Sequence, residues 1–209
     1  MTVRSKVGQV KLRQARPEDA QVVASLVDAA ADGMFTAMLG QKEILAEASL
    51  TPGHQLSVEH AVVAVANGEI LGSASAMTGA QARADSGQAL AAAAGWRSVR
   101  MMVVTSFFRQ ILRFMDRHED DDFYLLALAV TPEARDRGIG SMLLADVEQR
   151  AIAAGSARVN LDVDTKNRSA QRLYARHGFR QVAVSSRSWL SGAQVERWER
   201  SIGSTIDSR

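Results

Sequence analysis

Two arginines and two glycines follow an apolar run near the middle of the chain, and together they could bind an anion. The apolar run covers residues 123–130, and after Thr131-Pro132 the chain reads Arg135-Asp136-Arg137-Gly138-Ile139-Gly140-Ser141. This pattern predicts a buried strand, a glycine-containing loop and a helix that begins near Ile139 and ends near Gly155. The first N–H groups of a helix have no intrahelical acceptors, and glycine lets a ligand approach the backbone closely. We therefore expect a phosphate or pyrophosphate to bind here.

A second informative group of residues lies downstream of this loop. A strand is predicted over residues 159–163, and a helix is predicted to begin near Asn167 and to stop at Gly178. The spacing of this group is Asn167, Ala170, Leu173, Tyr174, Gly178 and Phe179. The upstream loop lacks the third glycine of the dinucleotide-binding fingerprint and the Gly-Lys-Ser/Thr of a P-loop, so neither of those nucleotide sites is expected.

The two segments resemble the signature of the GNAT superfamily of N-acetyltransferases. The first matches Val-x-Pro followed by Gln/Arg-x-x-Gly-x-Gly/Ala, and the second matches Asn-x-x-Ala-x-x-Leu-Tyr-x-x-x-Gly-Phe. The resemblance is strongest over residues 123–180. It implies an α/β (α+β) fold whose mixed, mostly antiparallel sheet has six to seven strands, splays between the fourth and fifth strands, and is flanked by helices. It also implies transfer of an acetyl group from acetyl-CoA to a primary amine of a small molecule, peptide or protein, by direct attack through a tetrahedral intermediate.

The resemblance also suggests which residues contact the co-substrate. The pyrophosphate would lie on the backbone N–H groups of the loop and the first helical turn, and the pantetheine arm would pair with the fourth strand like an added strand. Asn167 would hydrogen-bond that arm, cap its own helix, or both. The expected acetyl-CoA contacts are Leu128, Ala129, Val130, Arg135, Asp136, Arg137, Gly138, Ile139, Gly140, Ser141 and Asn167.

The resemblance gives Tyr174 the role of the acid and leaves the base open. Tyr174 would protonate the departing thiolate, or it would only pack with its hydroxyl bonded to CoA; a backbone N–H of the fourth strand would stabilise the oxyanion. Many relatives carry a glutamate on the fourth strand, whereas this strand has no carboxylate between Leu125 and Ala129. The base could be a water chain or one of four carboxylates, Asp28, Asp32, Asp162 and Asp164. Asp162 and Asp164 would share one face of the fifth strand, or they would simply be two exposed carboxylates. The missing glutamate favours an alternative function, a catalytically weak acetyl-CoA-binding sensor or interaction module.

Hydrophobic periodicity predicts the remaining elements. Residues 10–16 alternate as a strand, Pro17 opens a helix, and a second helical region follows from Met34 to Ala48. Asn67-Gly68 predicts a hairpin between strands at 61–66 and 69–77. The last strands are expected at 179–188 and 194–202. We interpret residues 1–209 as one domain, with a tail at 203–209.

The segment from Gly79 to Asp122 is much longer than an ordinary connection between strands. Its first part, residues 81–95, predicts a loop or a weak helix, and residues 96–118 predict an amphipathic helix. This insertion would cap the acceptor cleft, form a subunit contact or simply pack on the sheet. The acidic run at 119–122 would be solvated or would attract a cationic acceptor.

Composition excludes several other classes of protein. The chain has 209 residues with 0 cysteines, so disulfides and thiolate metal sites are excluded, and its 4 histidines lack helical zinc spacing, so we expect no metal. No apolar run approaches the roughly 18 residues of a membrane helix, and the N-terminus has no apolar signal core. We therefore expect a cytoplasmic protein without a membrane partner. The net charge of +2 gives no reason to expect a nucleic acid partner, and the C-terminal strands and the insertion offer surfaces for a homodimer.

Overall fold

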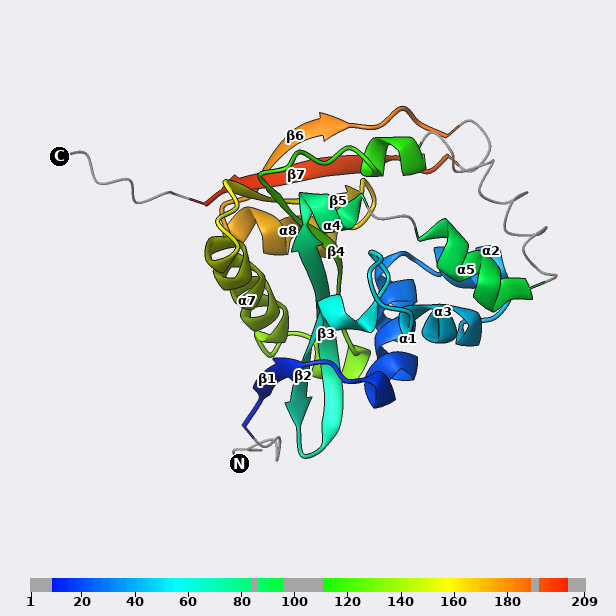
Figure 1. The fold of residues 1–209 in the computed structure, drawn as a ribbon. Coiled ribbons are helices and arrows are strands. Elements are labelled where there is room, and N and C mark those ends of the chain that lie inside the picture. Colours follow the sequence, from blue (N-terminus) through cyan, green and yellow to red (C-terminus); the bar gives the residue numbers. More distant parts are fainter. Residues whose placement is uncertain (1–8, 84–85, 96–110, 189–191, 203–209) are drawn as a thin grey trace.

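The computed structural model describes residues 9–83, 86–95, 111–188 and 192–202 (Figure 1). The elements of the first half are β1 (Lys11–Gln14), α1 (Ala20–Ala30), α2 (Met34–Leu39), α3 (Glu43–Ser49), β2 (Ala61–Ala66), β3 (Glu69–Thr78), α4 (Gly79–Ala82) and α5 (Gly87–Ala94). Those of the second half are β4 (Asp122–Val130), α7 (Ile139–Ala153), β5 (Arg158–Asp164), α8 (Arg168–Arg176), β6 (Arg180–Val184) and β7 (Val195–Ser201). Residues 111–115 are also helical.

The strands form a 7-stranded sheet in the order β1-β2-β3-β4-β5-β7-β6. All neighbouring strands are antiparallel except β4 and β5, which are parallel. The predicted mixed, mostly antiparallel sheet is therefore confirmed. The last strand, β7, lies between β5 and β6, so that β6 forms one edge of the sheet.

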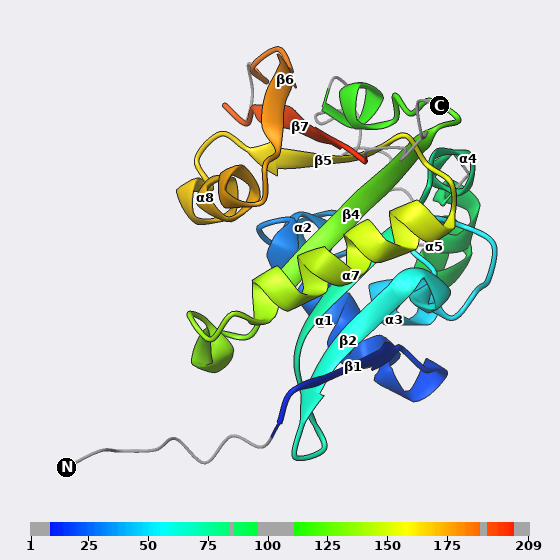
Figure 2. The ribbon, with the colours of Figure 1, turned by 90° about the vertical axis from the view of Figure 1, so that its left-hand side faces the viewer.

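The two parallel strands separate partway along their length, which we call the splay. Pairing runs from Asp122↔Arg158 to Leu125↔Leu161 and then stops, although β4 continues to Val130 and β5 to Asp164. The register between β3 and β4 shifts at the same point, where Leu126 is the extra residue of a bulge. A bulge bends its strand and increases the local twist. Figure 2 shows β4 and β5 diverging from a common end, as the resemblance to the GNAT superfamily implied.

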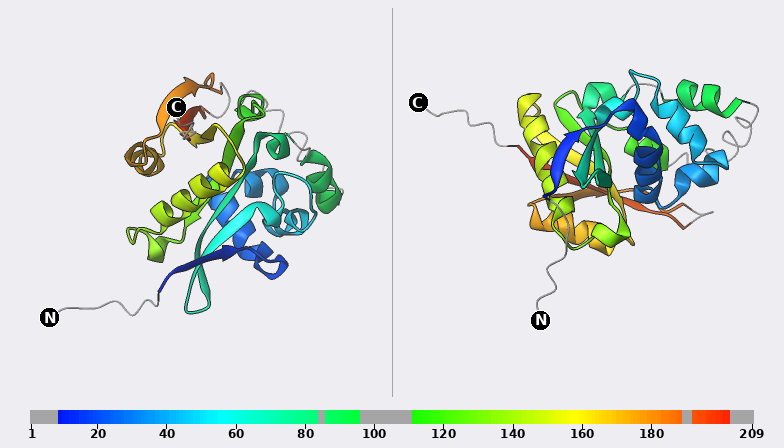
Figure 3. Two further views of the ribbon diagram at one scale, coloured as in Figure 1. Left: turned by 60° about the vertical axis from the view of Figure 1, so that its left-hand side comes forward. Right: turned by 90° about the horizontal axis from the view of Figure 1, so that it is seen from below.

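Helices cover both faces of the sheet (Figure 3). Each face has its own apolar core. On one face α7 and α8 pack over strand residues that include Val62, Leu125 and Leu161. On the other face α1, α2, α3 and α5 pack over residues that include Val63 and Ala127. Strands buried on both faces read as continuous apolar runs, which is why β2 and β4 lack polar alternation.

The insertion leaves and rejoins the sheet at one place. Thr78 at the end of β3 pairs with Phe123 at the start of β4, and a Cβ added to Gly79 would lie 2.0 Å from the carbonyl oxygen of Glu119. Arg83 also joins the two ends of the insertion, which we call its neck, by donating to the His118 carbonyl over 2.9 Å. The two ends of the insertion therefore lie next to each other. Its first part contains helices α4 and α5, residues 111–115 are helical as predicted, and residues 96–110 lie outside the described residues.

Several predicted boundaries shift. The first strand is β1 alone, four residues within the predicted 10–16, and the sixth ends at Val184 rather than Ser188. The helical region predicted from Met34 to Ala48 is two helices, because Gly40 adopts a left-handed conformation with φ 80° after α2. The tail predicted at 203–209 lies outside the described residues.

Candidate active site

The residues predicted to bind the pantetheine arm lie along one side of the splay. Leu128, Ala129 and Val130 pair with β3 along one edge, while beyond Leu125 the other edge of β4 has no strand partner among the described residues. The Val130 carbonyl accepts a hydrogen bond from Arg135 Nε over 3.4 Å. An unpaired edge of this kind can extend its sheet by pairing with the amide groups of an extended ligand.

The loop before α7 presents a row of free backbone donors. Asp136 (φ 61°) and Gly138 (φ 78°) have left-handed conformations, and α7 begins at Ile139. In the described part of the chain, the N–H groups of Asp136, Arg137 and Gly138 meet no acceptor, and the first main-chain bond of the helix runs from Met142 N–H to the Gly138 carbonyl. Consecutive free N–H groups at the positive end of a helix dipole favour an anion. Since Arg135 and Arg137 are exposed beside them, these residues fit a pyrophosphate group.

The two glycines of this loop have different roles. A Cβ built on Gly138 would have nothing within 4 Å, so the space beside it is open. A Cβ on Gly140 would lie 3.3 Å from Leu173 Cδ2 on α8 and 3.8 Å from Leu128 Cδ2 on β4. Gly138 therefore provides the turn, whereas Gly140 lets the start of α7 pack closely against α8 and the splay.

Helix α8 carries the other two predicted site residues. Asn167 Oδ1 accepts a hydrogen bond from Ala170 N–H over 3.1 Å, which confirms its capping role; its contact with the co-substrate stays a prediction. Tyr174 is 7% exposed, and its ring packs on Phe179 with centroids 5.8 Å apart. Burial raises the pKa of Tyr174 to about 12, so its hydroxyl is protonated at neutral pH. No described residue forms a hydrogen bond with that hydroxyl, which leaves it available as a donor.

Polar side chains hold α7 and α8 in place around this tyrosine. Gln171 Nε2 donates to the carbonyl of Asp164 over 3.3 Å and to Glu196 on β7 over 3.3 Å. Glu148 on α7 binds Arg200 on β7. Strands β5 and β7 therefore both hold α8, and β7 also holds α7.

The four candidate base residues are engaged or lie away from the splay. Asp28 accepts hydrogen bonds from the backbone N–H and hydroxyl of Thr36, at 2.9 and 2.5 Å, and so joins α1 to α2. Asp164 accepts from Lys166 N–H over 2.7 Å in the turn after β5, and Asp32 is exposed after α1. Asp162 was expected to be exposed if it had no catalytic role, and this is wrong, because its side chain is 0% exposed.

Asp162 belongs to a buried polar group that sequence reasoning missed. Arg197 binds both of its carboxylate oxygens, and the Tyr124 hydroxyl donates to Oδ2 over 3.3 Å. Burial raises the pKa of Asp162, and the two hydrogen bonds from Arg197 oppose that shift. Asp162 and Arg197 are direct cross-strand neighbours in the β5–β7 register. The pairing of these two residues would have predicted that Asp162 is buried, but it can be recognised only once β7 is known to lie beside β5.

Two wider properties of the described residues complete the geometry. Among them, no helix combines the length and apolar character that crossing a bilayer requires. Nor does this part of the chain bring together three or more His, Cys, Asp or Glu side chains that could hold a metal ion.

Comparison with known proteins identifies relatives in sequence and in fold. Aminoalkylphosphonate N-acetyltransferase of Salmonella typhimurium is 43% identical over 54 residues, which are 26% of this chain and 35% of that protein. The chain thus matches only about a third of the length of this curated relative. Among solved structures, an N-acetyltransferase from Staphylococcus aureus Mu50 is similar with a TM-score of 0.63 and 19% identity, over 91% of this chain and 100% of that chain. The ribosomal-protein-S18-alanine N-acetyltransferase of Escherichia coli has a TM-score of 0.59 and 13% identity, over 96% of this chain and 99% of that chain.

The family match covers the insertion and all three parts of the candidate site. The sequence model of the acetyltransferase (GNAT) family matches residues 42–179, which are more than half of the chain. This range contains the free edge of β4, the donor row before α7, and Tyr174. The protein belongs to the acetyltransferase (GNAT) family.

Proposed function

We propose that the protein is an acetyl-CoA-dependent N-acetyltransferase that acts on a primary amine. One observation carries the proposal: the free edge of β4, the open donor row before α7 and the buried Tyr174 surround a single splay. Gly140 lies between these parts, because a Cβ added there would be 3.3 Å from Leu173 on α8 and 3.8 Å from Leu128 on β4. Membership of the family indicates an acetyltransferase, and this geometry supports acetyl-CoA as the acetyl donor.

The chain's own residues would hold the co-substrate by its two polar regions. The backbone from Asp136 to Ser141 would donate to the pyrophosphate, with Arg135 and Arg137 adding positive charge. Leu128, Ala129 and Val130 would pair with the amides of the arm, and Asn167, whose Oδ1 is used by its helix cap, would offer its side-chain amide N–H groups. Acetyl-CoA, when bound, supplies an activated thioester.

Transfer would form a C–N bond and break the C–S bond. The amine nitrogen attacks the thioester carbon, and a backbone N–H on the free edge of β4 donates to the oxygen that becomes negative. As the C–S bond breaks, the Tyr174 hydroxyl gives its proton to the sulfur. Burial raises the pKa of Tyr174 to about 12. The same buried environment would raise the pKa of the CoA thiol, so burial shifts the proton donor and the proton acceptor in the same direction.

The acceptor class is proposed from the fold and the relatives. One relative is named for aminoalkylphosphonates and one structural neighbour for the alanine of a ribosomal protein. Both acceptors carry a primary amine on a short carbon frame. Because each carboxylate candidate is engaged or distant, we propose that the ammonium proton leaves through water.

A second function is favoured by that same lack of a free carboxylate at the splay within the described residues. The chain would then bind acetyl-CoA as a sensor or interaction module and would transfer the acetyl group slowly. Such a module would keep the donor row and the β4 edge, and it would not depend on the Tyr174 hydroxyl.

The test is thiol release from acetyl-CoA in the presence of 2-aminoethylphosphonate, alanine-initiated peptides, polyamines and aminoglycosides, with wild type and Tyr174→Phe. We expect turnover with one class, and a kcat roughly 100-fold lower in Tyr174→Phe with an acetyl-CoA Kd within about twofold of wild type. Binding of acetyl-CoA without turnover of any amine would support the sensor. An unchanged kcat in Tyr174→Phe would refute the acid role.

A further inference from the structure

Arg197 of β7 binds two separate parts of the chain at once. Its guanidinium donates from Nε to Asp162 Oδ1 over 3.0 Å and from Nη2 to Asp162 Oδ2 over 2.8 Å. The same group donates to the backbone carbonyls of Phe114, over 3.1 Å, and Met115, over 2.9 Å, and also to that of Arg117. Arginine can do both because its planar head carries five N–H donors in a fixed arrangement. It therefore connects β5 with the carboxyl end of the 111–115 helix.

Asp162 places one end of this connection at the vertex of the splay. Pairing of β4 with β5 ends at Leu125↔Leu161, so Asp162 is the first residue of β5 beyond it. Leu161 and Val163 belong to the core beneath α7, and successive strand residues point to opposite faces. The Asp162 side chain consequently lies on the face away from α7, where the Tyr124 hydroxyl reaches it.

That face is the one from which an amine would approach. The donor row at the start of α7 lies on the α7 face, and an arm that runs along the free edge of β4 fills the splay from there. The amine must then reach the thioester carbon from the opposite side. This step rests on the proposed function, since it takes the splay as the place of acetyl transfer.

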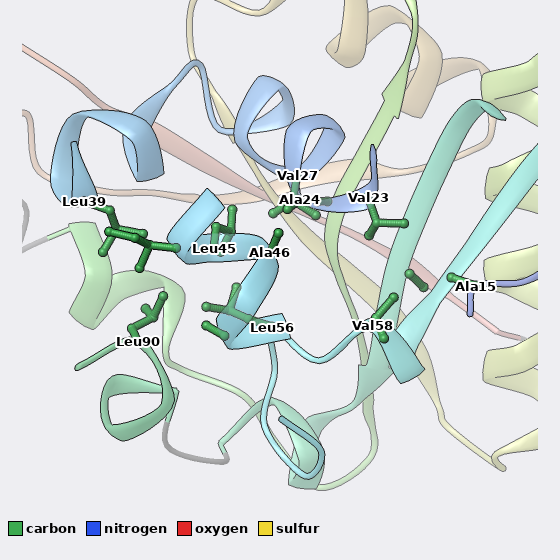
Figure 4. Close-up of a cluster of buried hydrophobic side chains, with 14 of the residues drawn as sticks. Ala15, Val23, Ala24, Val27, Leu39, Leu45, Ala46, Leu56, Val58 and Leu90 are labelled. Carbon is green, nitrogen blue, oxygen red and sulfur yellow. The ribbon is translucent and has the colours of Figure 1, made fainter. Parts of the chain in front are cut away.

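The insertion is attached on both sides of the splay on this face. Leu90 and Ala94 of α5 pack into the core formed by α1, α2 and α3, and Leu90 lies beside Leu39 and Leu45 (Figure 4). At the other end, the short helix of residues 111–115 lies beside β7 (Figure 1). There the Arg197 guanidinium stacks over the Phe114 ring, 5.2 Å from its centroid.

We propose that Arg197 is a positioning residue for the amine acceptor, because it fixes residues 111–118 as the wall of the acceptor site on the β5 side. Asp162 holds the guanidinium in place and is not itself the base, since its side chain is 0% exposed. Loss of Arg197 would displace the wall and leave the donor row on the other face intact. The amine KM would change, and the affinity for acetyl-CoA would not.

A double variant and a matched control separate this role from simple stabilisation. Arg197→Met leaves a buried carboxylate without its partner, which is strongly destabilising, whereas replacing both members of a buried pair by apolar residues of similar volume is often neutral. Asp162→Leu combined with Arg197→Met therefore keeps the fold and removes the bonds to the 111–115 helix. Asp19→Leu combined with Arg13→Met is the matched control, because Arg13, on the edge strand β1, also binds both oxygens of a buried aspartate, Asp19, at 2.6 and 3.0 Å.

The experiment combines titration calorimetry with acetyl-CoA, steady-state kinetics with 2-aminoethylphosphonate, spermidine and an alanine-initiated hexapeptide, and amide hydrogen exchange. In the double variant we expect acetyl-CoA affinity within twofold of wild type, an amine KM raised at least tenfold, and exchange at Asp116 N–H, which bonds to the Leu112 carbonyl, at least tenfold faster. The control variant, Asp19→Leu combined with Arg13→Met, should change none of these.

An unchanged amine KM in the double variant would overturn the proposal, as would equal losses for the amine and acetyl-CoA. If wild type turns over none of the three amines, the proposed function is in question, and hydrogen exchange still decides the positioning. Unchanged exchange at Asp116 would then overturn it, and faster exchange in the double variant alone would support it.

Discussion

Gly138 offers the sharpest test of the pyrophosphate site, because the structure predicts separate effects on folding and binding. Its φ of 78° is left-handed, and a Cβ there would have nothing within 4 Å. Gly138→Leu should therefore cost only the left-handed penalty of about 1–2 kcal/mol. That is a fraction of a normal folding stability of roughly 5–15 kcal/mol. The variant should fold, with a Tm lower by roughly 2–8 °C for a chain of this size.

Binding should suffer more than folding in this variant. The new side chain would occupy the open space where the phosphates meet the donor row. Losing one charge-assisted hydrogen bond costs about 1.5–3 kcal/mol, and each 1.4 kcal/mol is tenfold in Kd. We expect the Kd for acetyl-CoA, measured by titration calorimetry, to rise roughly ten- to a hundredfold.

Gly155 is the matched control at the other end of α7. It also has a left-handed conformation, with φ 71°, and a Cβ there would likewise have nothing within 4 Å. Gly155→Leu should lower the Tm by a similar amount and leave the Kd for acetyl-CoA unchanged. Wild-type affinity in Gly138→Leu, or equal loss of affinity in both variants, would refute the assignment of the donor row.

Two further predictions concern the neck of the insertion. The His118 ring packs at a tilt against Tyr124, and burial lowers the pKa of His118 to about 4, so the unfolded chain takes up a proton first as pH falls. The contribution of His118 to the free energy of unfolding should be complete above pH ~6.5 and should fall by about 3 kcal/mol toward pH ~4. Denaturant unfolding at several pH values should show a smaller loss of stability in His118→Phe than in wild type. An identical loss would exclude His118 as its source. Gly79→Ala should lower stability by about 2 kcal/mol or more, because its Cβ would lie 2.0 Å from the Glu119 carbonyl oxygen. Gly140→Ala should cost less, since its nearest neighbour, at 3.3 Å, is a leucine side chain that can move; equal Tm losses would contradict the steric argument.

Sequence reasoning succeeded where the interactions are local. The start of α7 after Gly138 and its end near Gly155 follow from residues adjacent in the chain. The capping of α8 by Asn167 depends on an acceptor three positions from its donor. The hairpin at Asn67-Gly68 likewise needs only the turn residues and their neighbours.

The neck of the insertion shows what could not be predicted. The length of the segment indicated an insertion, but Gly79 gave no sign that it lies against Glu119. Arg83, His118 and Asp120 meet there only because β3 and β4 pair side by side. Contacts of this kind depend on which strands are neighbours, and that is a property of the whole sheet.

The amino-acid sequence by itself determined the family, the donor row before α7 and the placement of Tyr174 on the following helix, since each is encoded by residues a few positions apart. The folded sheet was needed to show that the expected splay begins after Leu125, that β7 lies beside β5, and that Asp162 is thereby buried against Arg197. Asp162 and Arg197 are 35 positions apart, and their pairing depends on strand order. The order of the strands depends on burying both faces of the sheet at once, and no short stretch of sequence predicts that order.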